Sequence, residues 1–144
     1  MIVSIPLSIE YDKVNSNGFK ISKEIFSIGV KKCLKEFIDK GVCYIEKGSP
    51  KDVLAKKKEN HYIVALRSEF LWGTIKNIDI ENKNAEVEIF DLEKENFLKI
   101  KNPEIVFYYS VDYELKDNII EIRDILTMKP YLQSNVESVY KDLK

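Results

Sequence analysis

The chain has 144 residues, of which 44% are hydrophobic and 33% are charged. These values predict one folded domain spanning residues 1–144 and argue against a disordered chain, which would lack the apolar surface for a core. The 23 basic and 24 acidic side chains almost cancel, so we expect no general electrostatic attraction to nucleic acid or anionic lipid.

The first predicted element is an opening strand over residues 2–11. Its apolar residues alternate from Val3 to Tyr11, and Pro6 places the strand at a sheet edge because proline cannot donate to a ladder. The segment lacks the basic start of a secretion signal, and no run approaches the roughly 18 apolar residues of a membrane span. We therefore expect a soluble protein in a reducing interior.

A tight turn at Asn15–Gly18 and the main helix come next. The helix is predicted to begin after the N-cap Ser22 and to end at Gly41. Two adjacent rows of residues form an apolar stripe of helical period, which is typical of a helix packed on a sheet. The rows contain Ile25, Gly29, Cys33 and Phe37, and Phe26, Val30, Leu34 and Ile38.

A short strand at Val42–Ile45 precedes a polar stretch, residues 46–60, that has no clear periodicity. This stretch predicts a loop, with at most a brief helical turn after its proline. Lys56, Lys57 and Lys58 could bind phosphate and so make nucleic acid an alternative partner, although such a run is more often a solvated loop.

Three alternating segments then predict a β-meander at His61–Arg67, Phe70–Glu81 and Ala85–Phe90. Gly73 indicates a bulge or a close backbone approach in the middle segment, and the apolar phase shifts after Ile75, which also indicates a bulge.

A short helix is predicted to follow the meander. Asp91 is its expected N-cap, and the helix continues toward Ile100. Its apolar residues Leu92, Phe97 and Leu98 are expected to face inward.

The segment Glu104–Met128 predicts the hairpin around which the fold is organised. Aromatic and β-branched residues alternate along its first strand, Lys116–Asn118 has turn chemistry, and Ile119–Met128 forms the returning strand. Ser110 is a small hydroxyl residue among bulky neighbours on the less apolar face of the first strand.

The C-terminal region completes the predicted fold. Lys129 and Pro130 are expected to end the returning strand, and Ser134 with Glu137 fits a capping box that opens a short helix, Val136–Leu143. We therefore expect an α+β fold, with a mostly antiparallel curved sheet or partial barrel of roughly six to eight strands, one main helix and this short C-terminal helix.

Cys33 and Cys43 are predicted to be buried thiols rather than a disulfide. No Cys or His spacing resembles a zinc site, and no loop has the ligand pattern of a calcium or magnesium site. We expect neither a metal ion nor a cofactor.

The order of these elements resembles that of a known family. The turn at Asn15–Gly18 leads into a helix at Ser22, Trp72–Ile75 lies in a glycine-containing hairpin, Phe107–Val111 forms a serine-bearing strand, and the last strand closes on Pro130. This arrangement resembles the prohead maturation proteases of tailed bacteriophages, whose fold is shared with herpesvirus assemblins.

The resemblance implies a Ser–His peptidase that trims scaffold and capsid subunits inside an immature phage shell. Ser110 would be the nucleophile and His61, the only histidine, its general base, since a serine hydroxyl is scarcely ionised at neutral pH. Asp112 or Asp79 would orient the imidazole.

The sequence departs from the family pattern around both catalytic positions. Ser68 and Glu69 stand where the family's histidine lies nearer the glycine hairpin. Tyr108 and Tyr109 crowd Ser110, where the family prefers small residues, and bulky neighbours hinder a backbone oxyanion hole.

Three hypotheses follow. The first is a phage or prophage assembly or virion protein that is non-catalytic, lies in the host cytoplasm or virion, and binds capsid, scaffold, portal or tail subunits or a second copy of itself. The second is an active peptidase using Ser110 and His61. The third is an unrelated cytoplasmic protein- or nucleic-acid-binding module that uses Lys56, Lys57 and Lys58 and exposed tyrosines.

Overall fold

The computed structural model describes residues 1–15, 18–44, 53–58, 61–66 and 70–134, and within 43–70 it describes the backbone alone. Its elements follow the order β1 (Ile2–Pro6), β2 (Phe19–Lys20), α1 (Lys23–Phe37), β3 (Gly41–Tyr44), β4 (Val53–Lys58), β5 (His61–Leu66), β6 (Phe70–Asp79), β7 (Asn84–Ile89), the 3₁₀ turn η2 (Asp91–Glu93), α2 (Lys94–Leu98), β8 (Pro103–Lys116) and β9 (Ile119–Ser134).

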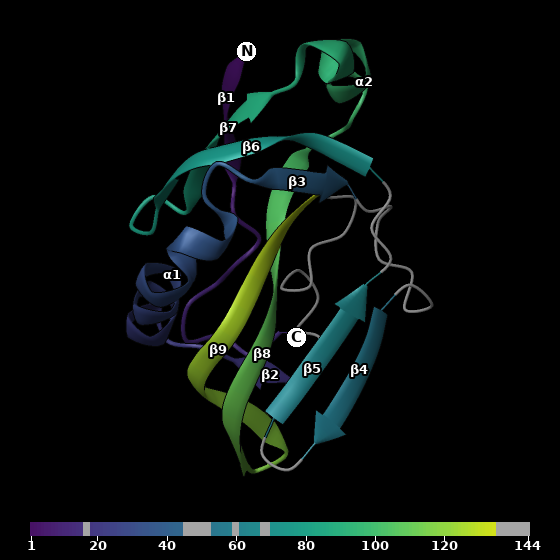
Figure 1. The fold of residues 1–144 in the computed structure, drawn as a ribbon. Helices are drawn as coiled ribbons and strands as arrows, with labels where there is room; N and C mark the ends of the chain where they lie inside the picture. Colours follow the sequence, from purple (N-terminus) through teal and green to yellow (C-terminus); the bar gives the residue numbers. More distant parts are fainter. Residues whose placement is uncertain (16–17, 45–52, 59–60, 67–69, 135–144) are drawn as a thin grey trace.

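One sheet contains the nine described strands. Neighbours follow the order β1-β7-β6-β3-β9-β8-β5-β4, and β2 pairs separately with β9. Most pairs are antiparallel, the exceptions being β2–β9 and β3–β9. In Figure 1, β3 and β6 cross the upper part of the molecule, whereas β8 and β9 run lengthwise below them. The predicted α+β class is confirmed, and the strand path across the described residues is open rather than closed into a barrel.

The edge position predicted for β1 from Pro6 is also confirmed, because β1 pairs only with β7 in the strand order. Just beyond β1, Leu7 forms an isolated parallel bridge with Ile105 of β8, and the Ser8 N–H donates to the Ile105 carbonyl at 2.8 Å. This contact attaches the N-terminal segment to the central hairpin.

The longest ladder joins β8 to β9 over almost the whole length of both strands. Asp117 and Asn118 form the two-residue turn between them, with φ values of 53° and 66°. A type I′ turn needs positive φ at both central residues, and Asp and Asn tolerate this conformation better than most side chains. The predicted hairpin and its turn are confirmed.

The predicted end of the last strand at Pro130 is wrong, because β9 continues to Ser134. Pro130 lies opposite Phe107 of β8, while the pairing of β9 with β3 begins one residue later, at Tyr131. Pro130 therefore has a ladder neighbour on one side only, and a strand tolerates a missing N–H at such a position.

The helix α1 begins as predicted and ends earlier. The Ser22 side chain accepts a hydrogen bond from the Ile25 N–H at 3.1 Å, as an N-cap should. The last helical residue is Phe37, and Asp39 rather than Gly41 takes the positive φ that reverses the chain.

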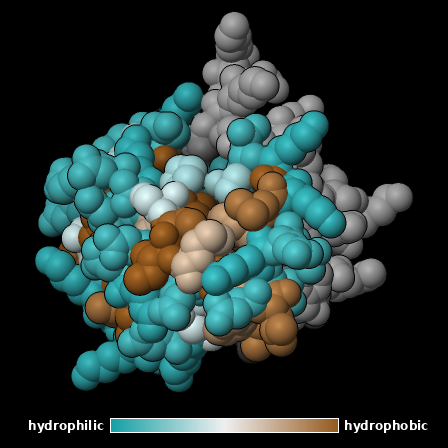
Figure 2. All heavy atoms as spheres, turned by 90° about the horizontal axis from the view of Figure 1, so that it is seen from above, coloured by the Kyte–Doolittle hydropathy of each residue, from teal (hydrophilic) through white to brown (hydrophobic). Residues whose placement is uncertain are grey.

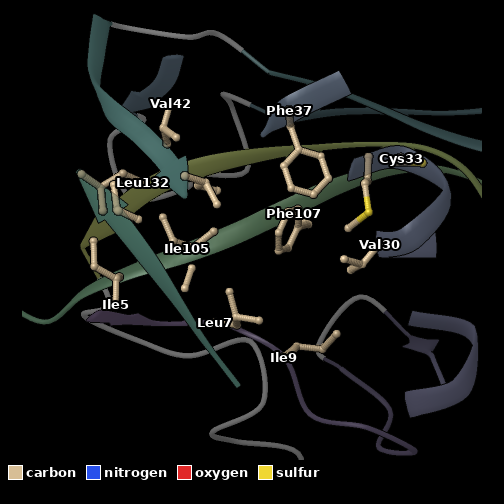
Figure 3. Packing of buried hydrophobic residues seen from close by; sticks show 14 of the residues in the cluster. Ile5, Leu7, Ile9, Val30, Cys33, Phe37, Val42, Ile105, Phe107 and Leu132 are labelled. Carbon is tan, nitrogen blue, oxygen red and sulfur yellow. The ribbon is translucent and has the colours of Figure 1, made fainter. Parts of the chain in front are cut away.

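The apolar stripe of α1 packs on β9. A Cβ added at Gly29 would lie 2.5 Å from Cδ1 of Ile125, so glycine is what lets helix and strand approach this closely. Figure 3 shows side chains from β1, α1, β8 and β9 converging in the core. Cys33 is among them as a free, buried thiol, as predicted, whereas the Cys43 side chain lies outside the described part.

The irregularities predicted in β6 are confirmed. The register with β3 shifts at Trp72, and the register with β7 shifts between Ile75 and Asn77. A Cβ added at Gly73 would collide with the carbonyl oxygen of Glu88, so the backbones approach closely here.

The loop predicted over residues 46–60 is partly wrong. Residues 53–58 form β4, an edge strand paired antiparallel with β5. The lysine run at Lys56–Lys58 therefore belongs to a strand. Its alternation is short and polar, which is why the sequence pattern does not reveal it.

The helix after β7 also differs from its prediction. Asp91 begins η2 and pairs with Lys94 instead of capping the helix with its side chain. Phe97 is buried, but Leu92 and Leu98 are 94% and 72% exposed, so their predicted inward orientation is wrong. A helix of five residues makes little more than one turn and can bury only one narrow side.

Among the described helices, none is long and apolar enough to cross a membrane. The predicted helix Val136–Leu143 lies outside the described residues. Ser134, its expected cap, is the last residue of β9, and its hydroxyl donates to the Lys101 carbonyl.

The two tight glycines in this sheet should differ sharply in their tolerance of alanine. Gly73→Ala would press a methyl group into backbone, and we expect a loss of about 2–3 kcal/mol in the free energy of unfolding. Gly41→Ala is the control, because its Cβ would meet the Leu71 side chain at 2.7 Å, and this exposed side chain can rotate away. Urea titrations of both variants test the contrast, which equal losses would contradict.

Candidate functional site

The strand register places the predicted catalytic residues in one short stretch of the β5–β8 ladder. His61 lies opposite Asp112, and Ser110 lies opposite Ile63, two residues further along β5. Directly opposed residues in an antiparallel pair have Cβ atoms about 4.5–5.5 Å apart, and diagonal neighbours lie roughly 7–8 Å apart. Ser110 and Asp112 are both half-buried, while the His61 side chain lies outside the described part.

The backbone around Ser110 is paired on both sides. Each residue from Ser110 to Asp112 has one partner on β5 and another on β9, and the register with β9 shifts on either side of the pair Val111–Asp112. Ladder hydrogen bonds therefore compete for the N–H groups that would have to converge on a developing oxyanion. The stretch therefore holds a hydroxyl and a carboxyl group on a backbone that is paired with both neighbouring strands.

The alternative orienting residue, Asp79, belongs to a different part of the sheet. β3 and β9 separate β6, which ends at Asp79, from β8. The Asp79 carboxylate accepts hydrogen bonds from the Asn82 N–H at 3.0 Å and from the Asn82 Nδ2 at 2.8 Å, and these bonds lower its pKa. Asp79 stabilises the β6–β7 turn and does not lie beside Ser110.

A buried carboxyl group that the sequence reasoning missed lies at the start of β8. Glu104 is only 4% exposed and is the one buried charged residue of the described chain. Its Oε1 accepts a hydrogen bond from Gln133 Nε2 at 2.6 Å, and the Ser8 hydroxyl also bonds to the carboxyl group. Burial raises the Glu104 pKa, although both hydrogen bonds oppose the shift.

Two tyrosines extend this cluster along the hairpin. The rings of Tyr108 and Tyr131 meet edge to face, with centroids 5.7 Å apart. Burial, with smaller contributions from Tyr131 and Glu104, raises the Tyr108 pKa to about 12, so its hydroxyl is neutral at physiological pH. The Lys129 ammonium lies 5.5 Å from the centre of the Tyr131 ring.

A third feature is an apolar surface at the end of the molecule that carries the N-terminus. Six large apolar side chains, each between 38% and 94% exposed, belong to the N-terminus, the start of β6 and the segment from β7 to α2. We call this set the outer apolar surface: Met1, Ile2, Leu71, Phe90, Leu92 and Leu98. Figure 2 views this end and shows brown apolar surface gathered near the middle of the face.

Backbone pairing holds this surface together. The Met1 carbonyl accepts a hydrogen bond from the Ile89 N–H at 2.8 Å, and the Phe90 N–H donates to the Trp72 carbonyl at 2.9 Å. Phe97 anchors α2, because its ring packs on Trp72 with centroids 6.4 Å apart. The exposed side chains are thus presented from a paired, anchored framework.

No group of three or more acidic, histidine or cysteine side chains with metal-binding geometry occurs in the described part of the chain. Comparison with known proteins gives no further guide: no family model, no curated protein and no solved structure matches this chain. The fold and these three features are therefore the basis for assigning a function.

The three large side chains of the α2 segment should respond very differently to truncation. Leu92→Ser and Leu98→Ser should change the free energy of unfolding by no more than about 0.5 kcal/mol, because both side chains are already in solvent. Phe97→Ala should cost about 3 kcal/mol through the cavity left beside Trp72. Thermal or urea unfolding measures all three, and a large loss for either leucine variant would contradict the exposure described.

Proposed function

We propose that this protein is a non-catalytic assembly or virion protein of a bacteriophage or prophage. It acts by binding capsid, scaffold, portal or tail subunits, in the host cytoplasm or in the virion, and its organisation is similar to that of the prohead maturation proteases. The order of sequence elements supports the phage context. The outer apolar surface supports the mode of action.

The outer apolar surface carries the proposal. Leucine is a residue type that usually belongs to the core, yet Leu92 and Leu98 are both exposed. An exposed apolar cluster is costly for a protein that works alone, and such clusters commonly mark sites where another protein binds. Apolar side chains on a paired backbone also lose little conformational freedom on binding, which favours a specific interface.

Two observations support a non-catalytic role. The backbone near Ser110 is paired with β5 and with β9, so ladder bonds would compete with a backbone oxyanion hole. Of the two aspartates that the resemblance implies as orienting residues, Asp79 is bonded within a turn, so only Asp112 keeps that role.

An active Ser–His peptidase is the second candidate, because the register brings the positions of His61, Asp112 and Ser110 together. This arrangement has the residue types of a triad on two neighbouring strands. A peptidase of this kind would trim capsid or scaffold subunits.

Co-purification tests the binding role. We expect the tagged protein to retain a capsid, scaffold, portal or tail subunit encoded in the same genome, and the Leu92→Ser/Leu98→Ser variant to retain at least tenfold less. Ile28→Ser/Leu115→Ser is the matched control, because Ile28 and Leu115 are 49% and 57% exposed and lie on α1 and β8. A monomer that binds none of these subunits would refute the proposal.

Incubation with the same subunits tests the two candidates against each other. The non-catalytic role predicts no cleavage by the wild-type protein, measured by gel electrophoresis and mass spectrometry. Cleavage that is abolished by both Ser110→Ala and His61→Ala would establish the peptidase instead. Cleavage that survives both substitutions would indicate a contaminating enzyme, and the experiment would be repeated after further purification.

A further inference from the structure

We infer that Glu104 is a pH-sensitive latch that fastens the N-terminal segment to the end of the β8–β9 hairpin and loosens when its carboxyl group ionises. This inference goes beyond the proposed function and does not depend on it. It rests on the place of one buried acid where three segments of the chain meet.

Glu104 connects segments that are far apart in the sequence. The Gln133 side chain on β9 donates to its carboxyl group, and the Ser8 hydroxyl from the segment after β1 bonds to the same group. The Ser8 N–H also donates to Ile105, the residue next to Glu104. A single side chain thus links the exit of β1 to the first residues of β8 and the last residues of β9.

The described surroundings of Glu104 offer no cation to stabilise a carboxylate. Ser8 and Gln133 carry no charge, and the Tyr108 phenol is neutral at physiological pH because burial raises its pKa to about 12. Lys129 on β9 is exposed and lies over the Tyr131 ring. Lys101, in the connection that precedes β8, is exposed as well.

The remaining groups near the junction are already paired or bonded. Glu10 follows Ser8 on the N-terminal segment and pairs with Lys83 at 3.2 Å. The Ser134 hydroxyl is bonded to the Lys101 carbonyl. A buried carboxylate in these surroundings lacks a compensating charge, whereas the neutral acid can accept from Gln133 and donate to Ser8.

The direction of the effect follows from linkage. Because the Glu104 pKa is raised above its ordinary value of 4.5 in the closed junction, the closed state holds its proton more tightly than an open, hydrated state does. The latch is fully closed below that ordinary pKa and loses stability as the pH rises through the raised pKa. Within this window, opening should become about tenfold more favourable for each pH unit.

Amide hydrogen exchange can measure the opening directly. After correction for the intrinsic pH dependence of exchange, we expect the protection of the Ser8 amide to fall between pH 4.5 and the raised pKa in the wild-type protein. In Glu104→Gln the protection should be independent of pH. Glu114→Gln is the matched control, since Glu114 is an exposed carboxyl on the same strand, and this variant should behave as wild type.

A carbon-13 NMR titration of the wild-type carboxyl groups provides a second measurement, which does not depend on any variant folding. We expect the Glu104 carboxyl carbon to titrate above pH 4.5. The inference is overturned if this carbon titrates at or below that value, if Ser8 protection is constant across the range, or if Glu104→Gln loses protection with pH as the wild type does.

Discussion

The rest of the structure depends on the pairing of β8 with β9. Among the described strands this hairpin has the longest ladder, its two strands are joined by a two-residue turn, and other elements attach to it. The helix α1 packs on β9, β5 extends the sheet from β8, and β3 and β2 join β9 in parallel. Asp117 and Asn118 set the register next to the turn, and two irregularities, between Asp112 and Tyr113 and between Ser110 and Val111, shift it further along the hairpin.

Much of this fold could be predicted from the sequence, because strong local signals agreed with the tertiary structure. Ser22 marks the start of α1, and the apolar stripe of α1 marks the side of the helix that is buried. The alternation of β7 and β8 likewise marks the buried face of each strand. The misses arose where local and tertiary preferences differ. Pro130 suggested a strand end because proline lacks a backbone N–H. Only the neighbouring strand decides whether a donor is needed at this position, and that pairing is set by residues far away in the chain.

The candidate sites were predictable to a smaller extent. Ser110, His61 and Asp112 could be identified in the sequence from their residue types, and the strand register places their positions on neighbouring strands. The alternation of residues cannot show that the backbone beside Ser110 is paired on both sides. Glu104 gave no signal, since a glutamate at the start of a strand is usually solvated. Its burial depends on Ser8 and Gln133, which no sequence spacing connects. Leu92 and Leu98 were expected to face inward because apolar residues in a helical pattern normally belong to a core, and both are exposed.

The strand order has a consequence for synthesis on the ribosome. The last described strand, β9, lies between β3 and β8 near the middle of the sheet, so β3 cannot complete its pairing until residues 119–134 have left the exit tunnel. Until then α1 has no partner for Gly29, and the apolar inner faces of the earlier strands stay open to other nascent chains. Folding of this sheet is therefore delayed until β9 has been synthesised and has left the tunnel, which makes chaperone binding during elongation advantageous.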